Sequence, residues 1–151
     1  MAADAVTSRL WQGSVPDAGR ALPFDLVVLC AVEHQFGTLS RPFGRRARVP
    51  LRDCAPLSHR EVRDALRAAV EIAHAYHHGA NTVITCAMGL NRSGLVMALT
   101  LLELGATAQN AIAAIRKARP HSLCNPYFVQ LIHEVAGRSI LRLPITAAGA
   151  A

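Results

Sequence analysis

The sequence predicts an α/β fold in which helices flank a central, mostly parallel sheet. Strand-like runs alternate along the chain with long helix-like runs, which is the pattern of such folds. The clearest pair is a β-branched run at 82–85 followed by an apolar run of good helix formers at 93–104. Ligands in these folds bind at the carboxyl ends of the strands. The junction between these two runs is therefore the first place to look for a site.

The remaining strands are short and apolar. They are expected at 8–12, 26–30 and near 47–49. The run at 26–30 reads Leu-Val-Val-Leu-Cys, which indicates a buried strand. A loop is expected at 53–57.

Two of the other helices begin at recognisable caps. Ser58 and Glu61 form a Ser-x-x-Glu capping box that opens a helix to about 78. Thr107 caps a helix that runs to about 118. A last helix is expected from 126 to about 135.

Length and composition indicate one compact domain at 1–137 and a poorly ordered tail at 138–151. The 151 residues are 52% hydrophobic and 17% charged, as in an ordered globular protein. No apolar run reaches the roughly 18 residues of a membrane span, and the first residues lack a secretory signal pattern. We therefore expect a cytoplasmic protein whose four cysteines are free thiols.

The most informative segment is Cys86-Ala87-Met88-Gly89-Leu90-Asn91-Arg92-Ser93-Gly94. A cysteine and an arginine at this spacing, with a glycine between them, can close a loop around a phosphate dianion. The cysteine supplies a nucleophile, and the arginine supplies a two-pronged clamp for oxygens. Loop N–H groups and the following helix N-terminus complete the cradle and favour a thiolate.

The spacing alone is weak, because the chain repeats it elsewhere. Cys54 and Arg60 also stand six positions apart. Their segment contains a proline and lacks a glycine, and we expect no strand to lead into it. We interpret this second pair as a coincidence. The prediction for Cys86 depends on its context.

With this loop the chain resembles the cysteine-dependent protein tyrosine phosphatase superfamily, and in particular the small dual-specificity phosphatases. The family signature is His-Cys, five variable residues, Arg, then Ser or Thr. The resemblance extends to the segments 10–16, 49–53 and 119–131, and so covers roughly residues 8–136. It implies a phosphatase that acts on phosphorylated proteins or small phosphomonoesters without metal or cofactor.

The resemblance also implies roles for individual residues. Cys86 attacks phosphorus, Arg92 binds phosphoryl oxygens, and Ser93 assists departure of the thiolate. Asp53 is the candidate general acid, although it could instead be a turn former or a helix cap. Ser93 could also simply fill the first helical turn. The substrate-binding loop consists of Ala87, Met88, Gly89, Leu90, Asn91 and Arg92.

One position departs from the signature, because Thr85 replaces the family histidine. A threonine hydroxyl could still bond a loop carbonyl, but it carries no positive charge. We expect weaker stabilisation of the Cys86 thiolate than in typical members, and an alkaline-shifted activity optimum.

Several alternatives stay open. A phosphoinositide or RNA phosphatase ranks lower because 87–91 carry no basic residue, and a sulfur transferase because of Asp53 and the Arg-Ser-Gly ending. A pseudophosphatase that binds phosphorylated partners without turnover is the non-enzyme alternative.

Two polar clusters offer further alternatives. The histidines at 74, 77 and 78 could bind zinc but lack a third ligand type at useful spacing. The arginines at 41, 45, 46 and 48 could steer anions or form a solvated loop. Aromatic residues are only 5% and do not interleave with this basic cluster, so we expect no nucleic-acid partner, and also no membrane partner.

Overall fold

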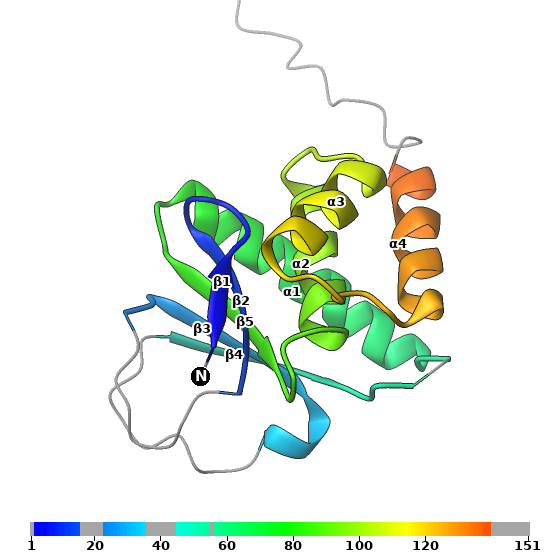
Figure 1. Ribbon diagram of the computed structural model, residues 1–151, viewed down its shortest axis with the longest axis horizontal. Helices are drawn as coiled ribbons and strands as arrows, with labels where there is room; N and C mark the ends of the chain where they lie inside the picture. The colour runs from blue at the N-terminus through cyan, green and yellow to red at the C-terminus, as the bar shows by residue number, and fades with distance from the viewer. Residues whose placement is uncertain (1, 16–22, 36–44, 55, 140–151) are drawn as a thin grey trace, which may run out of the picture.

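A five-stranded sheet forms the centre of the protein. The structure, a computed structural model, describes residues 2–15, 23–35, 45–54 and 56–139. The strands are β1 (Ala3–Ala5), β2 (Leu10–Ser14), β3 (Leu26–Ala31), β4 (Arg45–Leu51) and β5 (Thr82–Cys86). Their order in the sheet is β1-β2-β5-β3-β4 (Figure 1).

The sheet is parallel except at one edge, which confirms the predicted fold class. β5 lies between β2 and β3 and is parallel to both, with Ser14 beside Cys86 and Leu29 beside Thr85. Only β1 is antiparallel to its neighbour among the described strands. The central place of β5 brings the ends of β2 and β3 to the two sides of Cys86.

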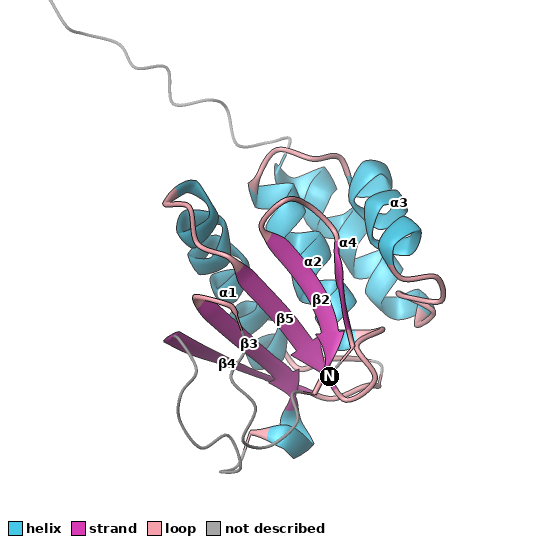
Figure 2. Ribbon diagram, turned by 60° about the vertical axis from the view of Figure 1, so that its left-hand side comes forward, coloured by secondary structure: helices cyan, strands magenta, loops and turns pink. Residues whose placement is uncertain are grey.

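The α-helices pack together on one face of this sheet (Figure 2). They are α1 (His59–His77), α2 (Arg92–Glu103), α3 (Ala108–Ala118) and α4 (Pro126–Ser139). α2 is buried along most of its length, because its apolar side chains contact the sheet and the other helices. On the opposite face, Val27, Leu29 and Val83 form a smaller apolar cluster with Trp11 and Phe24.

The predicted elements are present with shifted ends. The Ser58 capping box and the Thr107 cap both form, and α1 and α3 begin at the next residue. α4 continues to Ser139, four residues beyond the predicted end near 135. Residues 140–151 of the predicted tail lie outside the described residues, as does Arg41 of the basic cluster.

Two short elements were not predicted. β1 has the sequence Ala-Asp-Ala, which carries no strand signal. A 3₁₀ helix, η1 (Val32–His34), follows β3. No helix within the described ranges is long and apolar enough to cross a membrane.

Candidate active site

The loop that follows β5 curls tightly against the end of β2. Cys86 is the last residue of β5, and Arg92 is the first residue of α2. Gly89 has a φ of +70°, and a Cβ atom there would lie 2.4–2.6 Å from backbone atoms of Gly13 and Ser14. Only glycine fits at such a close approach. Gly89 is therefore the residue that allows the loop to pack against the end of β2.

The loop brings the predicted nucleophile next to a hydroxyl. Cys86 is 2% exposed, and its Sγ lies 3.3 Å from Oγ of the fully buried Ser93. Ser93 is in the first turn of α2, whose N-terminal backbone N–H groups favour negative charge. A thiolate at Cys86 would have both the hydroxyl and this helix end beside it.

Arg92 is held by hydrogen bonds at Nη1, whereas its Nε makes none. The side chain is buried, and Nη1 donates to Glu33 Oε2 at 2.6 Å and to the Leu51 carbonyl at 3.4 Å. The buried Nε has no hydrogen-bond partner among the described residues. Burial acts to lower the pKa of Arg92, but the hydrogen bond to Glu33 and the nearby negative charges raise it overall. The unsatisfied Nε donor suits an oxyanion.

Glu33 is the site residue that the sequence analysis missed. It lies in η1, at the end of β3, and the hydrogen bond from Arg92 lowers the pKa of its carboxyl group. Leu29 pairs with Thr85, so η1 begins next to the end of β5. A charged residue directly after a buried strand was the available signal, since parallel strands end at the same edge.

Asp53 reaches the same arginine from a third segment. Its Oδ2 lies 3.7 Å from Arg92 Nε, and the side chain is partly exposed. The neighbouring Arg52 is fixed by Glu61 in α1, with Nη2 to Oε2 at 2.7 Å and the Arg52 N–H to Oε1 at 3.0 Å. The structure thus brings together all four predicted catalytic residues, Cys86, Arg92, Asp53 and Ser93.

A glutamine beneath the loop was also missed. Gln12 in β2 is fully buried, and its Nε2 donates to the carbonyls of Gly89 at 3.0 Å and Leu90 at 3.3 Å. The same nitrogen lies 3.1 Å from Ser122 Oγ. A polar residue at an inward position of a predicted strand was its only signal in the sequence.

The segment between α3 and α4 supports the loop from outside. Leu123 N–H donates to the Leu90 carbonyl at 3.3 Å, and Asn91 Oδ1 accepts from the N–H groups of Cys124 and Asn125. His121 and Leu123 both have positive φ values, which are costly for residues other than glycine. This strained segment is held in place partly by the candidate site itself.

Thr85 does not replace the family histidine at the loop. Its Oγ1 donates to the Val28 carbonyl in β3 at 3.0 Å, rather than to a loop carbonyl. The expectation that the threonine hydroxyl could organise the loop is therefore wrong. The side chain joins two strands instead.

The predicted substrate-binding residues form the outer part of the loop. Met88 is 70% exposed, whereas Gly89 is buried and Ala87, Leu90 and Asn91 are half-buried. Glu33 and Asp53 are the charged side chains that pair with Arg92 here. An uncharged loop and two carboxylates therefore surround the arginine.

The other predicted clusters lie away from this loop. His74 and His78 stack with ring centroids 4.2 Å apart near the end of α1, and no group of three or more potential metal ligands gathers anywhere in the described ranges. Arg45, Arg46 and Arg48 lie on the edge strand β4.

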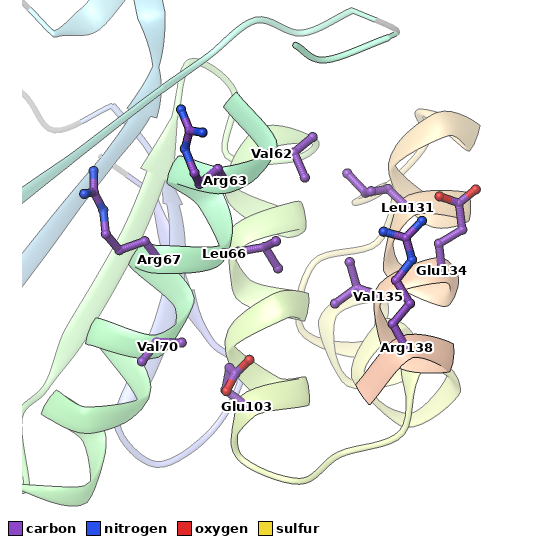
Figure 3. A pocket seen from close by; sticks show the side chains of 10 residues that line it. All are labelled: Val62, Arg63, Leu66, Arg67, Val70, Glu103, Leu131, Glu134, Val135 and Arg138. Atoms are coloured by element: carbon purple, nitrogen blue, oxygen red, sulfur yellow. The ribbon is translucent and has the colours of Figure 1, made fainter. Parts of the chain in front are cut away.

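An apolar groove between α1 and α4 is also remote from the site. Its volume is about 400 Å³, and Val62 and Leu66 of α1 face Leu131 and Val135 of α4 across it (Figure 3). None of the site residues lines this groove. It is a feature of the helical layer.

Among the comparisons with known proteins, the one with solved structures identifies the fold. No protein-family model matches the sequence, and no curated protein does. Human DUSP28 is similar in structure, with a TM-score of 0.79 and 21% identity over 91% of this chain and 95% of that one. Tk-PTP in its active form gives 0.75 and 22% over 90% and 97%.

A third solved structure is a human tyrosine phosphatase-like serine/threonine/tyrosine-interacting protein. Its TM-score is 0.72 at 14% identity, over 91% of this chain and 97% of that one. Similarity at these low identities shows the fold alone, and it confirms the fold that the resemblance of the loop implied. The chain has the fold of the small dual-specificity phosphatases.

Proposed function

We propose that this protein is a cysteine-dependent phosphatase that hydrolyses phosphomonoesters through a phospho-cysteine intermediate. The observation that carries the proposal is the unsatisfied Nε donor of Arg92. Its Nη1 is held by Glu33 while the buried Nε lacks a hydrogen-bond partner in the described structure. A buried donor without a partner is costly, and a bound phosphoryl oxygen would satisfy it.

We assign one residue to each chemical step. The Cys86 thiolate attacks phosphorus, so that a P–S bond forms and the P–O ester bond breaks, while Asp53 gives its proton to the leaving oxygen. Water then attacks the phospho-cysteine and loses a proton to Asp53, and the P–S bond breaks. Ser93, 3.3 Å from the sulfur, stabilises the departing thiolate.

The charges around the loop favour substrates with a single phosphate. Arg92 is flanked by Glu33 and Asp53, and residues 87–91 carry no cation. Polyanions such as phosphoinositides or RNA would meet these carboxylates without compensating charge from residues 87–91. Phosphotyrosine, phosphoserine or phosphothreonine in proteins, and small aryl phosphates, fit better. The free thiols suit a cytoplasmic location.

The test is hydrolysis of an aryl phosphate with excess chelator across pH. Cys86→Ser should lower kcat/KM by about 10³-fold or more, because the nucleophile is lost. Cys54→Ser is the matched control, since Cys54 is exposed and also stands six residues before an arginine. It should retain the wild-type rate.

The pH profile identifies the acid. Asp53→Asn should lower the rate and remove the alkaline limb, because the general acid must be protonated to act. Turnover that survives Cys86→Ser, or that the chelator abolishes, would overturn the proposal.

A pseudophosphatase is the second candidate, and Thr85 is the observation that favours it. The threonine bonds Val28 and gives no support to the thiolate. Absence of turnover at every pH, with oxyanions still bound, would select this alternative.

A further inference from the structure

Three consecutive peptide groups of the loop have their carbonyls tied from outside. Arg119 Nη2 donates to the Met88 carbonyl at 3.2 Å, and Gln12 Nε2 donates to those of Gly89 and Leu90. Of these two side chains, only Gln12 is fully buried, and it bonds two neighbouring carbonyls at once. Its own position is fixed by β2, which pairs with β5 beneath the loop.

Carbonyl direction determines N–H direction. In a planar trans peptide the C=O and N–H groups point to opposite sides. With their carbonyls tied to Gln12 and Arg119, the N–H groups of Gly89, Leu90 and Asn91 point away from these side chains. No described residue accepts a hydrogen bond from these three N–H groups. They are left as donors for an anion.

We infer that Gln12 is a positioning residue, which orients the loop N–H groups toward the phosphoryl oxygens of the substrate. It performs the organising task that Thr85 does not, because the Thr85 hydroxyl is bonded to Val28. The inference rests on the proposed function, and it adds a residue from β2, 77 positions from Gly89.

The amide orientation supports this assignment. Nε2 faces two carbonyl oxygens and a hydroxyl, so the opposite orientation of the amide would place oxygen against oxygen. The buried Oε1 has no partner in the described structure. All hydrogen bonds of the Gln12 amide group are therefore made by its Nε2, which is the atom that holds the loop carbonyls.

The test compares Gln12→Met with Thr100→Val. Methionine keeps the length of glutamine but donates no hydrogen bond. Thr100 is a buried polar residue whose hydroxyl bonds the Val96 carbonyl inside α2, so its loss affects the core without affecting the loop. Both variants are assayed where circular dichroism shows them folded.

Gln12→Met should raise the dissociation constant for tungstate, a phosphate-like oxyanion, and the KM for an aryl phosphate by about 10- to 100-fold. Thr100→Val should stay within about twofold of wild type on both measures. Gln12→Glu should be worse than Gln12→Met, since a carboxylate would face the loop carbonyls and the substrate charge.

A second readout needs no variant. Tungstate added to the wild type should shift the backbone amide NMR signals of Gly89, Leu90 and Asn91. If tungstate binds while these signals stay unmoved, or if Gln12→Met behaves as Thr100→Val does, the role of Gln12 is overturned and the phosphatase proposal stands. A wild type that neither binds tungstate nor turns over substrate would overturn both.

Discussion

The two segments Cys54–Arg60 and Cys86–Arg92 have the same cysteine-to-arginine spacing, but their polar side chains have different roles. In the first, the polar groups hold the chain together. Ser58 caps α1, and Arg60 in the first turn of α1 pairs with Asp64 at 3.7 Å. In the second, the cysteine is buried beside Ser93, and the buried arginine keeps a donor that makes no hydrogen bond and lies 3.7 Å from Asp53.

The difference comes from what precedes each cysteine. Cys86 ends a central strand, so two neighbouring strands deliver Gln12 and Glu33 to its loop. Cys54 follows the edge strand β4 and is exposed, so the expectation that no strand leads into its segment is wrong. A short spacing motif therefore acquires chemistry only where the sheet surrounds it with side chains from other strands.

Exchanging arginine for lysine should have very different effects in the two segments. Arg92→Lys should lower kcat/KM for an aryl phosphate by about 10²- to 10³-fold, because lysine lacks the planar fork that binds two oxygens. Arg60→Lys should leave the rate unchanged, because Arg60 is exposed and makes only a weak surface ion pair with Asp64. Equal effects of the two exchanges would contradict the contrast drawn here.

A smaller effect is expected from removing the carboxylate behind the arginine. Glu33→Ala should lower kcat/KM by about 10-fold, because the guanidinium loses the partner that fixes Nη1 and moves relative to phosphorus. The exposed Glu134 in α4 provides the control, and Glu134→Ala should have no effect. Steady-state kinetics that show equal rates for both variants would remove Glu33 from the site.

The site divides into a part that the sequence predicts and a part that it does not. Cys86, Gly89 and Arg92 lie in one short segment, whose strand-loop-helix character is a local property. Local signals also predicted the capping box of α1, since Ser58 and Glu61 are three residues apart. Such features require no knowledge of which strands become neighbours.

Gln12 and Glu33 could not be assigned from local patterns. They stand 77 and 59 positions from their partners in the loop, and only the strand order β2-β5-β3 brings them there. Thr85 is the opposite case, in which a contact was predicted that the structure does not contain. Its position in the family signature suggested a loop contact, whereas its bond to Val28 depends on the pairing of β5 with β3.

The smallest expected effect concerns stability around the first segment. Glu61 accepts hydrogen bonds from Arg52 and Ser58, and mainly the Arg52 side chain holds the pKa of its carboxyl group well below the usual range. A carboxyl group with a lowered folded-state pKa stabilises the fold above the unfolded value of about 4.3, and this contribution is lost as the pH falls. Glu61→Gln should therefore reduce the free energy of unfolding at pH 7 by about 1–3 kcal/mol.

The pH dependence separates this charged contact from simple packing. Urea denaturation should show a constant deficit for Glu61→Gln between pH 7 and about 5, and a shrinking one below about pH 4 as Glu61 becomes protonated in the unfolded wild-type chain. Glu71→Gln, at an exposed position of the same helix, should match the wild type throughout. A deficit of equal size at pH 3 and pH 7 would mean that Glu61 supports the segment by its shape. The charge of Glu61 would then not stabilise this segment, and the difference from Cys86–Arg92 would not be electrostatic.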